Sequence, residues 1–327
     1  MSLIQTIPKQ DRPAAATSNS KWLHFAMQSM KAVEKEQSRE LIKKAELLEG
    51  MLKSGYEKKQ ILADFVLMGG LASNTHIALS TTIDLLIVYR GNNNELFSED
   101  YQNLEAIIHF REKTKQYLNE LFPEAQVDDS LPFALKMSIP SWSCTFCLHF
   151  GFWHINRTPA SGISPIDGRV KIYNKTEIDF ADVDPLQAMF LLNDKNVKTN
   201  ENAKPLIRIL KTLKAQSENK EHLSGFEIAS IVYSMDEYTL KKQQGLLLFL
   251  LLECSLFLKR LEDSVFLQRS IKSPDMMELF NLSNEAYFKK GIKNLKAELD
   301  MLIKHLVLEI DLYTNIYNLP ADMKICL

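Results

Sequence analysis

The residues best suited to chemistry in this sequence are a glycine pair and one aspartate that lie close together in the chain. Gly69 and Gly70 follow the apolar run Phe65–Met68, and Asp84 lies near the start of a second apolar run, Ile83–Tyr89. A carboxylate in a buried strand is costly unless a cation compensates its charge. The pattern predicts either a metal ion or cationic partner at Asp84, or an aspartate at a strand edge that caps a turn.

The order strand, glycine pair, turn and acid-bearing strand resembles the signature of the nucleotidyltransferase superfamily. Gly69 and Gly70 match its glycine pair, and Thr75 matches the threonine of its Gly-Thr step. Asn74 stands where glycine is usual, and asparagine is the next best residue at positive φ. The resemblance implies that Gly69, Gly70 and Thr75 belong to a nucleotide-binding turn.

The family's paired aspartates are only half present. Asp84 matches the second acid of the Asp-x-Asp motif, whereas Thr82 replaces the first. In the family these carboxylates hold two Mg²⁺ ions that clamp the attacking and leaving oxygens. A neutral hydroxyl is a poor ligand for Mg²⁺. The resemblance therefore implies Asp84 as the one surviving catalytic and metal-binding carboxylate, Thr82 as a nucleotide contact, and Mg²⁺ held weakly at most.

The third acid of the family is also missing from its expected place. It lies on a later core strand, and the matching segment, residues 143–157, contains no Asp or Glu. Asp179 and Asp182 follow in a segment that resembles the loop into the family's helical lobe, where exposed loop acids are expected.

A zinc site is the alternative that the residues themselves suggest in this segment. Cys144, Cys147, His149 and His154 are close in sequence. However, Cys144 and Cys147 on one strand point to opposite faces, whereas zinc needs four convergent ligands. Buried thiols and packed histidines are favoured over zinc.

A second motif lies in the helical part of the chain. The segment Pro205–Lys214 resembles a family helix whose lysine touches the nucleotide phosphates, and Lys211 matches that lysine. The basic residues of this segment recur at helical periodicity; they are Lys204, Arg208, Lys211 and Lys214. They predict either a local basic face for a nucleoside triphosphate or RNA, or simply a solvated face.

The elements that must position these residues divide into three parts. Residues 1–20 have the composition of a flexible tail. Residues 21–183 combine a long brace helix over Lys21–Lys53 with apolar strands and a helix over Tyr101–Phe122. Residues 184–327 read as nearly all helix, including a buried helix over Leu246–Leu258 that is too short to span a bilayer.

Length, composition and net charge limit the class of protein that the chain can form. The chain has 327 residues, a formal net charge of -2 and 46% hydrophobic residues, which predicts a globular protein without whole-surface affinity for nucleic acid. Four cysteines and no apolar leader predict a reducing, cytoplasmic environment without a membrane role.

We therefore expect an α/β protein with a mixed β-sheet in a nucleotidyltransferase core and a C-terminal helical lobe. The resemblance is to the branch that contains oligoadenylate synthetase, cyclic GMP-AMP synthase and the bacterial CD-NTases. The expected function is a catalytically impaired protein that binds a nucleotide, RNA or a protein partner, as the inactive DZF domains of animal RNA-binding proteins serve in dimerisation. The alternative is an active Mg²⁺-dependent nucleotidyltransferase that makes oligonucleotides or cyclic nucleotides. The number of carboxylates around Asp84 separates the two.

Overall fold

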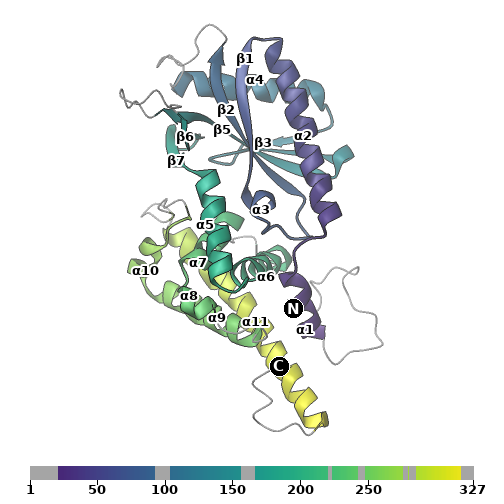
Figure 1. Cartoon of the computed structure of the whole chain (residues 1–327), viewed down its shortest axis with the longest axis vertical. Coiled ribbons are helices and arrows are strands. Elements are labelled where there is room, and N and C mark those ends of the chain that lie inside the picture. Colours follow the sequence, from purple (N-terminus) through teal and green to yellow (C-terminus); the bar gives the residue numbers. More distant parts are fainter. Residues whose placement is uncertain are drawn as a thin grey trace. The chain divides into compact units, whose positions relative to one another are not determined.

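The computed structural model describes residues 21–92, 104–155, 166–219, 223–241, 247–274, 279 and 285–317 (Figure 1). The tail expected over residues 1–20 lies outside them. The chain forms two compact units. The sheet unit comprises residues 33–74 and 80–190, and the helical unit comprises the described parts of residues 1–32, 75–79 and 191–327.

The sheet unit is built on one mixed seven-stranded sheet (Figure 1). The strand order is β1-β2-β5-β4-β3, with β6 beside β5 and β7 beside β6. β2 and β5 are parallel, and the other pairs are antiparallel. The strands are β1 (Ile61–Met68), β2 (Thr82–Asn92), β3 (Gln126–Asp128), β4 (Leu135–Ile139), β5 (Cys144–Ile155), β6 (Ile166–Asn174) and β7 (Asp179–Val183). The mixed α/β architecture expected from the sequence is confirmed.

One face of this sheet is covered by helices α2 (Lys35–Glu57) and α4 (Leu104–Leu121) (Figure 1). Side chains of a strand alternate between faces, so every second residue of β5 enters this core. Phe146, Leu148 and Phe150 are at most 1% exposed and join one cluster with Leu48 of α2 and Phe110 of α4. We call this side the helix-covered face.

A cluster of charges fastens α4 to the segment that follows β3. The Arg111 guanidinium is buried and donates to the Asp129 carboxylate, which also accepts from Lys115 at 2.9 Å and pairs with Lys175 at 3.2 Å. Burial alone would raise the pKa of Asp129, but the hydrogen bonds from these cations outweigh it and hold the pKa well below its ordinary value.

The single brace helix expected over Lys21–Lys53 is wrong, because two helices form there. α1 (Lys21–Met30) ends four residues before α2 begins. Trp22 of α1 is buried in the helical core, whereas Leu48 of α2 is buried under the sheet. At about 100° per residue, the two apolar stripes are rotated by roughly 90° from each other. One straight helix could not have directed both into a single core.

The helical unit packs seven further elements around a continuous apolar core. They are α5 (Pro185–Lys198), whose first residues belong to the sheet unit, α6 (Ala203–Gln216), α7 (Gly225–Ser234), α8 (Glu237–Leu240), α9 (Leu247–Asp263), α10 (Val265–Ser270) and α11 (Glu285–Tyr317). The expected buried helix is confirmed as α9, with Leu250 buried and Glu253 half-buried at its rim. Within the described residues, no helix has the length and apolar character needed to cross a membrane.

Candidate functional site

The glycine pair begins a short helix, α3 (Gly69–Ala72), between β1 and β2. Gly69 has φ +68°, and a Cβ at this position would overlap the carboxylate of Asp84. A side chain is therefore excluded both by the left-handed backbone and by the acid. The Ser73 hydroxyl donates to the Gly69 carbonyl oxygen at 2.8 Å and closes the turn. The sequence motif thus brings Gly69 and Asp84 into direct contact.

The rest of the turn is arranged partly as expected. Asn74 has φ +55°, which confirms the prediction of a left-handed residue at this position. Thr75 lies in the helical unit and is 1% exposed. Its side-chain oxygen accepts a hydrogen bond from Lys211 at 3.0 Å, and its carbonyl oxygen accepts a second from the same ammonium at 3.2 Å. Thr75 therefore positions Lys211 within the helical unit.

The face of the sheet opposite the helices carries Asp84, and we call it the Asp84 face. A row of register partners crosses it from strand to strand: Met68 of β1, Asp84 of β2, Cys147 of β5 and Lys136 of β4. Register partners project to the same side of a sheet. The nearest strand neighbours of Asp84 are thus a thioether and a thiol, with an exposed lysine one strand further on.

A histidine completes the surroundings of Asp84. His149 lies two residues beyond Cys147 on β5, and its Nε2 is 3.9 Å from Oδ1 of Asp84. This separation is too long for a direct hydrogen bond. The side chains of His149 and Asp84 are 16% and 30% exposed. Asp84 thus lies at the boundary between the sheet interior and solvent, where a ligand can reach it.

The thiol beside Asp84 is held in its neutral form. Burial and, to a smaller extent, the negative charge of Asp84 together raise the pKa of Cys147 to about 12, and Lys136 opposes this shift only in part. At neutral pH this sulfur is therefore neither a nucleophile nor an anionic metal ligand. Cys144 lies on the helix-covered face, so the two thiols project to opposite sides of β5, which confirms the prediction from strand alternation.

Among the described residues of the later strands, no third acid is a strand neighbour of Asp84. Asp179 and Asp182 are exposed, as expected, but the expected loop is wrong because both residues belong to β7. Their register partners are Asn174 and Lys171 of β6. β6 and β5 separate β7 from β2, so neither carboxylate is a strand neighbour of Asp84.

The donor set around Asp84 does not fit the two Mg²⁺ ions that the fold family implies. The neighbouring positions offer the hydroxyl of Thr82 and the neutral thiol of Cys147, whereas Mg²⁺ favours anionic oxygen ligands. Among the residues that the structure describes, no three His, Cys, Asp or Glu side chains converge to hold a metal ion. Asp84 alone can contact only a cation that arrives with other ligands.

Only some of the basic residues expected on one face of α6 retain partial exposure to solvent. Arg208 is 6% exposed and donates from Nε to the carbonyl oxygen of Met30 at 2.8 Å. It therefore helps to hold α1 and cannot belong to a solvated face, which corrects the expectation. Lys204 and Lys214 are half-buried, and burial lowers the pKa of both. Together with Lys211, they are the members of the set that keep some exposure.

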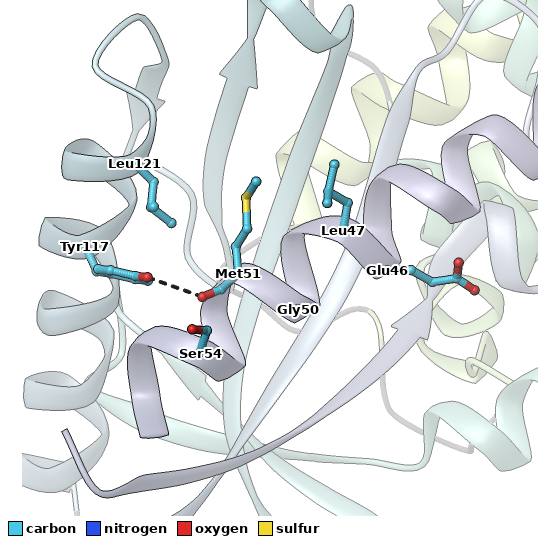
Figure 2. A pocket seen from close by; sticks show the side chains of 7 residues that line it. All are labelled: Glu46, Leu47, Gly50, Met51, Ser54, Tyr117 and Leu121. Atoms are coloured by element: carbon cyan, nitrogen blue, oxygen red, sulfur yellow. Dashed lines mark hydrogen bonds between the residues drawn. The ribbon is translucent and has the colours of Figure 1, made fainter. Parts of the chain in front are cut away.

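A shallow groove of about 390 Å³ lies elsewhere in the sheet unit, between α2 and α4 (Figure 2). Tyr117 reaches across it and donates to the carbonyl oxygen of Met51 at 3.3 Å. Its lining residues are Glu46, Leu47, Gly50, Met51, Ser54, Tyr117 and Leu121. This lining contains no cation that could neutralise a phosphate. The groove therefore does not compete with the Asp84 face as a nucleotide site.

No sequence motif marked Lys136, and the pattern around His149 predicted a packed histidine or, as the less favoured alternative, a zinc ligand. Both reach the Asp84 face because the register of β2, β5 and β4 aligns their strands. Alternation along β5 predicts that Cys147 and His149 share a face. No local pattern in the sequence specifies which residue of β2 lies opposite them.

Comparison with known proteins gives consistent relatives. No family model matches the chain. The chain is 28% identical over 192 residues to a cyclic dinucleotide synthase CdnE of Yersinia aleksiciae, a match that covers 53% of this chain and 48% of that protein. It is 24% identical over 213 residues to a c-di-GMP synthase of Flavobacteriaceae sp. genome_bin_11, with 54% and 56% covered. The chain thus spans about half the length of the curated relatives it matches.

A solved structure agrees over a longer span. The STING-associated CdnE c-di-GMP synthase from Capnocytophaga granulosa superposes with a TM-score of 0.66 and 22% identity, covering 93% of this chain and 92% of that one. At this identity the likeness concerns the fold. Taken with the curated relatives and the glycine–aspartate turn, it makes the chain similar to the CD-NTase-like branch of the nucleotidyltransferase superfamily.

Proposed function

We propose that the chain binds a nucleoside triphosphate as its magnesium complex and transfers a nucleotidyl group from it to a hydroxyl, as a cyclic dinucleotide or oligonucleotide synthase does. The observation that carries this proposal is the direct contact between Gly69 and the Asp84 carboxylate. It joins a turn suited to phosphates to the acid that would meet the cation of the substrate. The curated relatives favour this function over the impaired protein expected from Thr82 alone.

The chain's own residues would act through placement and charge. Backbone N–H groups of the Gly69–Gly70 turn would receive the phosphates, and Asp84 would accept the proton of the attacking hydroxyl. A bond forms between the hydroxyl oxygen and the α-phosphorus, and the bond to pyrophosphate breaks. Thr75 and Lys211 remain predicted nucleotide contacts. The ammonium of Lys211 would supply a compact positive charge. With one carboxylate, we expect turnover below the usual range of about 1–10³ per second.

A second candidate is a protein that binds a nucleotide, RNA or a protein partner without transfer. It is favoured by the donor set beside Asp84, where Thr82 and Cys147 contribute no negative charge. Binding without chemistry would need the phosphate turn but not a full set of carboxylates. This candidate predicts a stable nucleotide complex from which pyrophosphate is never released.

Labelled nucleoside triphosphates separate the two. Each triphosphate and each pair would be incubated with the full chain and Mg²⁺ or Mn²⁺, and products would be resolved by chromatography. We expect a slowly formed product that disappears in Asp84→Asn and persists in Asp64→Asn. Asp64 is the matched control because it is an acid of the same sheet whose carboxylate already accepts hydrogen bonds from Arg90 and Trp153. Bound nucleotide without product would support the second candidate in its nucleotide-binding form, and absence of both would contradict the transferase and any nucleotide-binding role.

A further inference from the structure

Residues 82, 84 and 147 form a compact triangle on the Asp84 face. Asp84 and Cys147 are register partners on adjacent parallel strands, so their Cα atoms are about 4.8 Å apart. Thr82 precedes Asp84 by two residues on β2, which places it about 6.6 Å along the strand with its side chain on the same face. Two divalent ions in a shared centre lie about 3.5–4 Å apart. The triangle thus has the dimensions of a metal centre but not its ligands.

The side chains at positions 82, 84 and 147 explain why the triangle lacks the ligands of a metal centre. Asp84 supplies one carboxylate, Thr82 a neutral hydroxyl and Cys147 a soft sulfur atom. Mg²⁺ and Mn²⁺ are suited to carboxylate, carbonyl and water oxygens. The backbone needs no adjustment to accept such ligands, because the register of β2 and β5 already fixes the three positions. The obstacle is therefore confined to two side chains.

We propose that residues 82 and 147 set the affinity of the Asp84 face for hard divalent cations, so that carboxylates at both positions would convert this face into a cation site. Cys147 is then a specificity-determining residue, and its sulfur disfavours a free Mg²⁺ ion beside Asp84, but not a cation that arrives with the ligands of a nucleotide. The proposal concerns metal binding alone and does not depend on whether the chain transfers nucleotides. It also identifies the smallest change that would supply the missing ligands.

The test is calorimetric titration of Mn²⁺, without nucleotide, into the full chain and the variant Thr82→Asp/Cys147→Asp. We expect the variant to bind Mn²⁺ about ten- to a hundredfold more tightly than the unchanged chain, because the number of charged oxygen ligands tunes the affinity of a cation site. The matched control is Thr81→Asp/Cys147→Asp, which adds the same charge but moves one carboxylate to the neighbouring residue of the chain. Because adjacent strand residues alternate in direction, the control should gain much less.

Equal gains in the two double variants would contradict the proposal, because charge rather than placement would then explain the binding. A folded Thr82→Asp/Cys147→Asp chain with unchanged Mn²⁺ affinity would also overturn it. If Cys147→Asp prevents folding, the single variants Thr82→Asp and Thr81→Asp provide the same comparison, at the half-buried first residue of β2 and at the exposed residue before it. Thr82→Asp should then show the larger Mn²⁺-dependent rise in melting temperature, and equal rises would again overturn the proposal.

Discussion

The two faces of the sheet are built from alternate residues of the same strands, yet they differ in packing and in exposure to solvent. On β5, Phe146 and Phe150 enter a packed aromatic core, whereas Cys147 and His149 project beside Asp84. The first face excludes water and tolerates little change in volume. The second keeps a partly exposed carboxylate against a glycine. The helix-covered face thus holds the larger buried cluster, whereas the Asp84 face combines a smaller one around Leu86 and Val88 with a carboxylate that a ligand can reach.

The largest expected effect lies on the helix-covered face. Phe150→Ala removes a ring that is 1% exposed, makes an edge contact with Phe110 at a centroid distance of 5.9 Å and lies under the Arg111 guanidinium. We expect a loss of about 3–5 kcal/mol in the free energy of unfolding. Urea denaturation measures it, with Thr145→Ala on the Asp84 face of the same strand as the control. The control should lose less than about 1 kcal/mol, and equal losses would contradict the division between faces.

The charge cluster on α4 comes next. Asp129→Asn leaves the buried Arg111 with only its longer contact to the Glu112 carboxylate at 3.4 Å, and breaking such a pair costs about 3 kcal/mol. Because the pKa of Asp129 is lowered by folding, its contribution is complete above the ordinary carboxyl pKa of about 3.9 and declines as the pH falls toward the lowered value. Thermal unfolding between pH 7 and pH 3 should show the variant's deficit shrinking as the pH falls. A deficit independent of pH would contradict this origin.

A smaller effect is expected at the turn of the Asp84 face. Gly69→Ala forces a side chain into left-handed backbone and against the Asp84 carboxylate, at a cost of about 1–3 kcal/mol. Nucleotide affinity should fall with it, because Asp84 must move. Gly50→Ala is the matched control, since a Cβ there meets nothing within 4 Å and alanine favours a helix by about 1 kcal/mol. Opposite signs in differential scanning calorimetry are expected, and a Gly69→Ala chain as stable as Gly50→Ala would be inconsistent with the contact.

The sequence predicted what depends on local pattern. The cores of β1 and β2 are where the apolar runs placed them, since strand propensity and continuous hydrophobicity mark a central strand. Asn74 was recognised because few residues adopt positive φ. α9 was recognised from its apolar run. These features are decided by residues close to one another in the chain.

What the sequence did not predict depends on distant pairing. The expected loop at Asp179 is strand β7 because β6 supplies a partner with matching alternation. The brace helix breaks because its two halves serve different cores. Arg208 was predicted to be a surface cation, but it is buried and donates a hydrogen bond to the carbonyl oxygen of Met30. The neighbours of Asp84 follow from strand register, which no local motif encodes.

The most direct measurement is equilibrium binding of a fluorescent nucleoside triphosphate to the unchanged chain, Asp84→Asn and Asp64→Asn, with Mg²⁺ and with the metal removed. If Asp84 meets the cation of the substrate, Asp84→Asn should weaken binding of the magnesium complex about tenfold, or about 1.4 kcal/mol. Without metal the same variant should bind the triphosphate no more weakly than the unchanged chain, since a negative charge near the phosphates has been removed. Asp64→Asn should change neither affinity. Equal weakening with and without Mg²⁺, or identical behaviour of the two variants, would contradict a nucleotide site at Asp84.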